Sequence, residues 1–217
     1  MSFPGSPKLI RGGLVAVDPN SGAVQRILTL QYNPDSVSRT LQIQAHGDGS
    51  GDLSEALRLK GPAVETIKLD AELDAADYLA QPDQYPNVVQ YGLHPQIAAL
   101  EALVNPSSAH LNGVNGMAGS GSLEIIPAQA PLTLFVWGGN RVQPVRISEF
   151  SVTEEAFDPL LNPIRAKLSL GLRVLSVADV GFDNRAGGLY MSYLRARETM
   201  AQRLPPGSFA ALGITGL

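Results

Sequence analysis

Two long segments of this 217-residue chain alternate between apolar and polar residues, and this period constrains the fold more than any other feature. Along residues 164–174 the apolar positions are Ile164, Ala166, Leu168, Leu170, Leu172 and Val174. Along residues 65–74 they are Ile67, Leu69, Ala71 and Leu73, separated by Lys68, Asp70, Glu72 and Asp74. Successive side chains of a strand point to opposite faces. Each segment therefore predicts a strand with one buried face and one face that is wet or lies at an interface.

Shorter apolar runs bounded by turn residues predict the other strands. Residues 9–17 and 24–32 are β-prone, and the turn Asp18-Pro-Asn-Ser-Gly22 between them predicts a hairpin. Residues 37–44, 132–137 and 141–153 complete the set, with a tight turn at Gly138-Gly139 and a break at residues 158–163. Residues 46–52 are rich in glycine and aspartate and are expected to form a flexible loop.

Helical spacing occurs in the middle of the chain and near its end. Residues 75–80 predict a short helix and residues 94–104 a longer one, in which Pro95 suits the first turn. Residues 112–122 are rich in glycine and predict a mobile loop. Residues 186–203 repeat apolar positions every three or four residues, which predicts an amphipathic helix. The nearly uncharged residues 208–217 are expected either to dock on a partner or to pack on their own domain.

Together these segments predict a mainly β fold, a β-barrel or sandwich of seven or eight strands. A short helical insertion at about residues 75–122 interrupts it, and a C-terminal helix follows it. We expect a β domain over residues 1–180, and a C-terminal helix with an apolar tail over residues 181–217.

The residues that usually carry chemistry do not form a recognisable pattern. The chain has no cysteine, and its three histidines show no metal-ligand spacing. It has no G-x-S-x-G nucleophile motif, and its Gly-rich residues 116–121 lack the lysine of a phosphate-binding loop. Glu154 and Glu155 are adjacent, so on a strand they point to opposite faces and form no acid–base pair. We therefore expect no enzyme activity, no catalytic residue, no cofactor and no metal.

Charge and hydropathy narrow the range of partners. The net charge is −4 and no basic patch is visible, which disfavours nucleic-acid binding. Charged residues make up only 17% of the chain. This fits a surface partly covered by neighbouring subunits, or equally a glycine- and alanine-rich source proteome. No secretory signal and no apolar run of membrane-spanning length is present, so we expect a location in the bacterial cytoplasm without direct membrane insertion.

Five groups of residues, in this order along residues 8–180, resemble one known family. They are Leu30-Gln-Tyr-Asn-Pro-Asp35 with Arg39; Leu59-Lys-Gly-Pro62 with Glu65-Thr66; Leu73-Asp-Ala-Ala-Asp77; Leu134-Phe-Val-Trp-Gly138 with Pro144-Val-Arg146; and Thr153-Glu-Glu-Ala-Phe-Asp-Pro159 with Leu161-Asn-Pro163. As an ordered set, they are similar to the tube-protein-like domain of baseplates in contractile injection systems, which are phage-tail-like particles.

The resemblance implies a tail-tube-like β fold and a structural role. Family members form a hexameric ring that joins the spike hub to the inner tube, so the implied partners are further copies of the chain, the spike or hub protein, the inner tube protein and the baseplate wedge proteins. The implied location is an assembled particle in the bacterial cytoplasm, with release or membrane docking also open. Many relatives carry a LysM-like module at the C-terminus. This chain has only a helix and an apolar tail after Val180, so the contacts of that module are not expected here.

Ten residues are candidates for an interface between subunits: Arg39, Trp137, Arg146, Glu154, Glu155, Phe157, Asp158, Arg165, Tyr190 and Tyr193. We expect Arg39, Arg146 and Arg165 to pair with Glu154, Glu155 or Asp158 across a subunit boundary. Trp137, the only tryptophan, suits either the core or an interface anchor.

Two other functions remain open at this stage. A ligand- or effector-binding module of the same particle would need an aromatic groove, and an aromatic content of 6% without clustering argues against one. A hydrolase with dispersed catalytic residues would need histidines and carboxylates that converge in a pocket.

Overall fold

A computed structural model describes residues 9–45, 58–119 and 130–216 of the chain. It contains one antiparallel seven-stranded sheet with the strand order β2-β1-β5-β6-β7-β4-β3. The strands are β1 (Gly13–Val17), β2 (Val24–Thr29), β3 (Val37–Gln42), β4 (Val64–Asp74), β5 (Leu132–Val136), β6 (Val142–Phe157) and β7 (Pro163–Val174). The mainly β prediction is confirmed. The sheet is not a closed barrel, because its end strands β2 and β3 each pair with a single neighbour.

The two alternating segments form β4 and β7, which pair along most of their length. On each strand every second side chain is buried, Ile67 and Leu172 completely. The side chains between them, such as Lys68 and Lys167, are exposed. The period of two therefore gives the sheet an apolar inner face and a polar outer face, as the sequence predicts.

The predicted hairpin is formed by β1 and β2. Its turn is held by Asp18, whose carboxylate accepts hydrogen bonds from the backbone N–H of Asn20 and Ser21 at 3.0 and 2.6 Å. These bonds lower the pKa of Asp18. Gly22 completes the turn with a positive φ of 75°, a conformation that suits glycine.

The insertion between β4 and β5 is helical and holds α1 (Ala76–Leu79), α2 (Pro86–Tyr91), α3 (His94–Glu101) and α4 (Ser108–Gly119). The sequence predicts α1 and α3 but indicates neither α2 nor α4. The expected loop at residues 112–122 is wrong for residues 112–119, which lie in α4. Glycine disfavours a helix interior by only about 1 kcal/mol, and the Ser107 hydroxyl accepts a hydrogen bond from the N–H of His110 at the helix start. Residues 120–122, and the expected loop at 46–52, lie outside the described residues.

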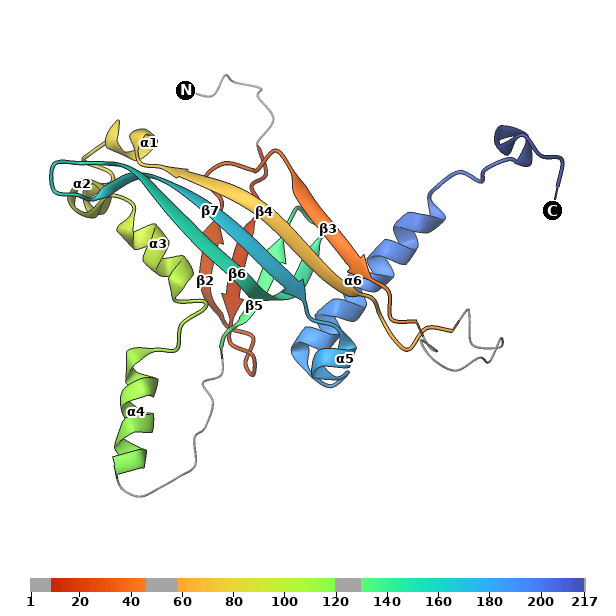
Figure 1. The fold of residues 1–217 in the computed structure, drawn as a ribbon, viewed down its shortest axis with the longest axis horizontal. Coiled ribbons are helices and arrows are strands. Elements are labelled where there is room, and N and C mark those ends of the chain that lie inside the picture. The colour runs from red at the N-terminus through yellow and green to blue at the C-terminus, as the bar shows by residue number, and fades with distance from the viewer. Residues whose placement is uncertain (1–8, 46–57, 120–129, 217) are drawn as a thin grey trace.

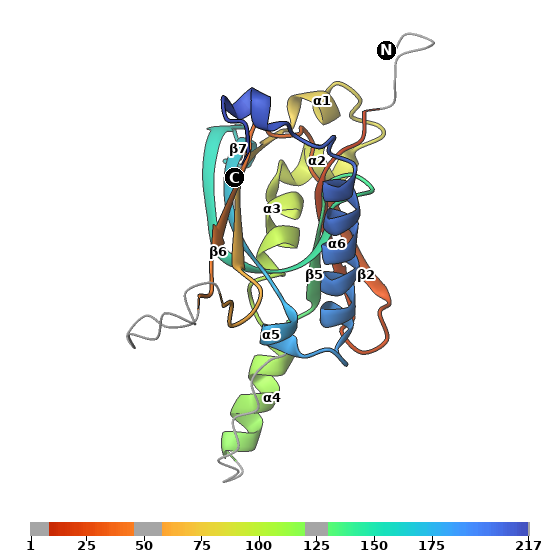
Figure 2. The same cartoon turned by 90° about the vertical axis from the view of Figure 1, so that its right-hand side faces the viewer.

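The core lies inside the bend of the sheet. Figure 1 shows β3, β4, β7 and β6 in front and β2 and β5 behind, and Figure 2 shows α3 between these two layers. Leu93, Ile97 and Leu100 of α3 join Leu14 and Leu168 of the strands in one buried cluster. The insertion thus supplies core side chains that, in a closed barrel, would come from the strands.

After β7 the chain forms α5 (Val177–Val180), which the sequence did not indicate, and then α6 (Arg185–Gln202), which it did. Asn184 caps α6 by accepting a hydrogen bond from the N–H of Ala186 at 2.9 Å. Tyr190 belongs to the same buried cluster as the strands, so α6 shares the core of the sheet. Beyond α6 the chain leaves the body of the molecule and ends in a short 3-10 helix, Phe209–Leu212 (Figure 1).

Candidate assembly surfaces

The outer face of β4, β7 and β6 carries a ladder of charged side chains. Lys68 pairs with Glu149 at 2.9 Å, and Lys167 pairs with Glu155 at 2.9 Å. Arg165 pairs with Asp74 at 3.0 Å. Exposed pairs of this kind contribute about 0–1 kcal/mol each to stability, so they do not explain the fold. They leave a broad polar surface on which opposite charges lie next to each other.

Gly171 leaves space for the ion pair between Lys68 and Glu149. In the strand register it lies between Lys68 of β4 and Glu149 of β6, which pair across it. A Cβ atom at Gly171 would lie 2.9 Å from the Cβ atom of Glu149, closer than real contacts allow. The missing side chain therefore gives the Lys68 ammonium and the Glu149 carboxylate room to meet.

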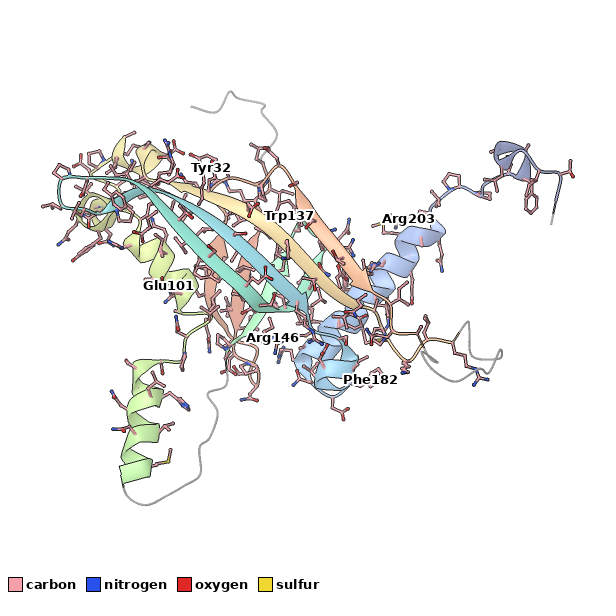
Figure 3. The ribbon with its side chains drawn as sticks, viewed as in Figure 1. Tyr32, Glu101, Trp137, Arg146, Phe182 and Arg203 are labelled. Atoms are coloured by element: carbon pink, nitrogen blue, oxygen red, sulfur yellow. The ribbon has the colours of Figure 1, made fainter. Side chains whose placement is uncertain are left out.

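A groove of about 570 Å³ lies between this outer face and the segment that joins β2 to β3. The Tyr32 hydroxyl, which donates a hydrogen bond to the Asp77 carboxylate at 2.7 Å, holds the segment in place. That bond raises the pKa of Tyr32. The charged residues of its lining are Asp35, Asp70, Glu72 and Lys167. Tyr32 is the only aromatic residue among the described residues of the lining, and Figure 3 shows it at one end of the sheet.

A buried polar cluster joins the other end of the sheet to α6. Its centre is Glu65 of β4, which is 3% exposed. The Glu65 carboxylate accepts a hydrogen bond from Arg39 Nε at 2.7 Å and one from Gln143 Nε2 at 3.1 Å. Its other oxygen lies 3.5 Å from the Arg197 guanidinium of α6. An unpaired buried carboxylate would be very costly, so these three partners are needed where Glu65 sits.

The same cluster holds helix α6 against the sheet. Arg39 also donates a hydrogen bond to the Tyr193 hydroxyl at 3.3 Å, and Arg197 lies over the Tyr193 ring at 5.5 Å from its centre. Burial opposes the charge of Arg39, but Glu65 outweighs it, so the pKa of Arg39 is raised. Burial, together with the charge of Glu65, raises the pKa of Tyr190. Strands β3, β4 and β6 and helix α6 are thus joined through one carboxylate.

The two edges of the sheet differ in chemistry. The β3 edge lies beside this cluster and contributes Arg39 to it. The β2 edge exposes apolar side chains, Val24 at 59% and Ile27 at 65%. An edge strand with free backbone groups and apolar side chains is a surface that usually pairs with another chain or is covered by one.

The structure places most of the candidate interface residues in contacts within the chain. Arg39 and Arg165 have the partners Glu65 and Asp74, and Glu155 pairs with Lys167. The Asp158 carboxylate accepts hydrogen bonds from the side-chain amide and the backbone N–H of Asn162 and from the backbone N–H of Leu160, and these contacts lower its pKa. The expected pairing across a subunit boundary is therefore not needed to satisfy these charges and stays a prediction.

The two tyrosines require a correction. Tyr190 and Tyr193 are 7% and 6% exposed, because they face the sheet of their own chain. They belong to the contact between α6 and the sheet, and they do not lie on the surface of the chain. An amphipathic helix presents its aromatic side to whatever covers it, and here the sheet covers it.

The remaining candidates lie apart from one another. Trp137 stacks on Phe135 with ring centres 5.8 Å apart and packs against the core cluster. Glu154 and Phe157 are exposed near the end of β6, Phe157 at 50%. Arg146 is exposed at the opposite end, near α5 (Figure 3). It lies opposite Arg173, and the Asp179 carboxylate bonds Arg173 at 2.6 Å.

Sequence reasoning missed the importance of Glu65 and Gln143. Glu65 is in phase with Ile67 and Leu69, so a charged residue occupies the apolar side of an alternating strand. The position of Glu65 in this alternation predicts a buried charge, and a buried charge needs a partner. Gln143 gives no comparable signal, because its burial depends on how β6 bends.

Within residues 9–45, 58–119 and 130–216, no group of three or more potential metal ligands comes together. His94 and His110 lie in α3 and α4, and His46 lies outside the described residues. None of the described helices combines the length and apolar character needed to cross a membrane. Neither a scan of protein-family models nor a search of curated proteins gave a match to this chain.

Proposed function

We propose that this protein is a structural subunit of a ring in the baseplate of a phage-tail-like contractile injection particle. In this role it connects the spike hub to the inner tube and to the surrounding baseplate. Six copies of the chain, as in the family it resembles, form the ring. The role is mechanical and requires no catalytic residue or cofactor.

One observation carries the proposal: a bent sheet that stays open at both edges and turns a charge-paired polar face outward. A monomeric barrel closes its sheet and removes its edges. Here β2 and β3 keep one unpaired side each. A subunit that joins different surfaces to its neighbours can close into a ring by rotation, and open edges are suitable joints.

The outer face supports a position along a water-filled channel. Long strands β4, β6 and β7 present alternating Lys, Arg, Asp and Glu side chains, with Ser151, Thr153 and Ser169 between them. The charged part of this face stays hydrated and offers little apolar surface to a passing protein. Most apolar residues of the same strands lie in the core cluster, whereas Phe157 at the end of β6 is 50% exposed.

A second candidate function is a ligand- or effector-binding module of the same particle. The groove of about 570 Å³ beside Tyr32 is the observation in its favour. Its lining of carboxylates with Lys167 suits a polar or cationic segment better than a sugar, because sugar sites stack on aromatic rings and Tyr32 is the only ring in it.

Purification of the tagged protein from its source cells, with mass spectrometry and negative-stain electron microscopy, tests the proposal. We expect sheath, tube and spike proteins in the eluate and sheathed rods on the grid. A monomer without such partners, from cells shown to express the neighbouring genes, would refute it. Recovery of a secreted effector whose binding is lost with Asp70→Asn, without rods, would favour the second function.

A further inference from the structure

The C-terminal segment, residues 204–216, is apolar, uncharged and uncovered. Leu204 is 78% exposed, Phe209 47%, Leu212 73% and Ile214 40%. In a 3-10 helix, residues three apart lie over each other, so Phe209 and Leu212 present one apolar face. The expected packing of this segment on its own domain is not seen. Exposed apolar side chains on a projecting segment are typical of a contact with another molecule.

An apolar groove of about 300 Å³ lies between the β2 edge and α3. Ile27 and Leu28 of β2 form one wall, and Pro95, Ala99 and Leu100 of α3 form the other. Within the described part of the chain, the lining contains no Asp, Glu, Lys, Arg or His residue. Its volume is at the lower end of the roughly 300–1,000 Å³ of ligand pockets, which suits a few side chains better than a large ligand.

An unsatisfied polar atom lies in the same groove. The side-chain oxygen of Gln96 is buried and has no hydrogen-bond partner among the residues that the structure describes. Leaving a buried acceptor without a donor costs about 1–3 kcal/mol. The terminal amide of Gln96 can rotate toward an incoming backbone N–H, so a peptide segment in the groove would remove that cost. A purely apolar ligand would not.

We propose that residues 204–216 of one copy dock in the groove between β2 and α3 of a second copy, with Phe209 and Leu212 as the anchors. Segment and groove match in chemistry, because both are apolar and uncharged. The larger groove beside Tyr32 is lined by carboxylates and Lys167 and does not match. The β2 edge next to the docking site offers free backbone groups as additional partners.

A second copy is the favoured occupant because of where the segment leaves the molecule. Figure 1 shows the chain end at the opposite side of the molecule from α3. The segment and the groove lie on opposite sides of the molecule, so the contact between two copies is heterologous. Each assembly of such copies then has a free segment at one end and a free groove at the other. Copies therefore add one after another until a ring closes. The docking requires only two copies and does not rest on the proposed function.

Disulfide cross-linking tests the docking directly, because the chain has no cysteine of its own. Full-length chains with Leu212→Cys and with Ala99→Cys, carrying tags of different mass, are mixed and oxidised. We expect a mixed dimer at a yield at least tenfold above that of Leu212→Cys mixed with Ser151→Cys, which lies on the outer face of β6. Adding Phe209→Asp to the Leu212→Cys chain should remove this excess. Ala210→Asp, the same charge at the next position, should retain most of it.

Two results would overturn the proposal. One is a mixed dimer no more abundant than the Ser151→Cys control. The other is a link within one chain when Leu212→Cys and Ala99→Cys are combined and oxidised at high dilution, which would place the segment in its own groove. Because particles are recovered from source cells in a separate experiment, loss of the docking and loss of the particle role are distinguishable.

Discussion

The inner and outer faces of the β4–β7–β6 layer come from the same strands and have opposite properties. Inside, Leu170 and its neighbours are almost completely buried. Outside, Ser169 and Lys167 are exposed, and Lys68, Arg165 and Lys167 pair with carboxylates on other strands of the layer. Alternate residues of one strand therefore differ in their environment: the inner residues pack in the core, and the outer residues remain in contact with solvent.

The largest expected loss of stability follows the shortening of a buried side chain on the inner face. We expect Leu170→Ala to lower the free energy of unfolding by about 2–5 kcal/mol, because it leaves a cavity in a fully packed site. Ser169→Ala, one residue away on the outer face, should change it by less than about 0.5 kcal/mol. Urea denaturation of the two variants measures the difference. Equal effects would mean that the two faces are not distinct.

Glu65 is charged although it lies on the buried inner face, and replacing it tests how the fold stabilises that charge. We expect Glu65→Gln to lower the free energy of unfolding by about 2–3 kcal/mol, because Arg39 loses the charge that compensates its partial burial. The double variant Glu65→Gln/Arg39→Gln should be less destabilised than the sum of the single variants. Additive losses in the denaturation of all three proteins would argue against the cluster.

Removing the capping box at the start of α5 is expected to cost less stability. The Ser176 hydroxyl accepts a hydrogen bond from the N–H of Ala178, and the Asp179 carboxylate accepts one from the N–H of Ser176. We expect Ser176→Ala to cost about 1 kcal/mol in the free energy of unfolding. Thermal unfolding of this variant beside Ser169→Ala measures the cost. No loss relative to that control would contradict the role of the cap.

Asp179 also predicts a pH dependence. Burial opposes its ionisation, but the bonds from Ser176 and the charges of Arg173 and Arg146 outweigh it, so its pKa lies below the ordinary 3.8. A carboxyl group with a lowered pKa stabilises the fold above its unfolded pKa and loses that contribution as the pH falls through the folded value. The advantage of the natural chain over Asp179→Asn in melting temperature should therefore be full at pH 6 and shrink below about pH 4. An advantage independent of pH would contradict this assignment.

The smallest effect on stability is expected on the outer face. Lys167→Glu replaces an exposed pair with Glu155 by a repulsion that water screens, so the free energy of unfolding should fall far less than for Leu170→Ala. Assembly should suffer more than folding, which fewer rods from source cells carrying this variant would reveal. A loss of stability as large as that of Leu170→Ala would remove the distinction between the two faces.

The parts of the fold that depend on local pattern could be predicted, and those that depend on long-range bending could not. Alternation located β4 and β7, and the turn at Asp18 located the first hairpin. The openness of the sheet depends on α3 entering between its layers, which no local pattern encodes. The sequence indicated Tyr190 and Tyr193 as one side of a helix but not the surface that covers them. The buried position of Gln143 likewise follows from tertiary packing.

Cryo-electron microscopy of particles purified through a tag on this chain tests whether the polar outer face lines the channel of a ring. We expect a closed ring of this protein between spike and tube, with Lys68, Lys167 and Glu155 facing the channel. A ring in which that face is covered by another protein, or particles that lack this chain between spike and tube, would contradict it.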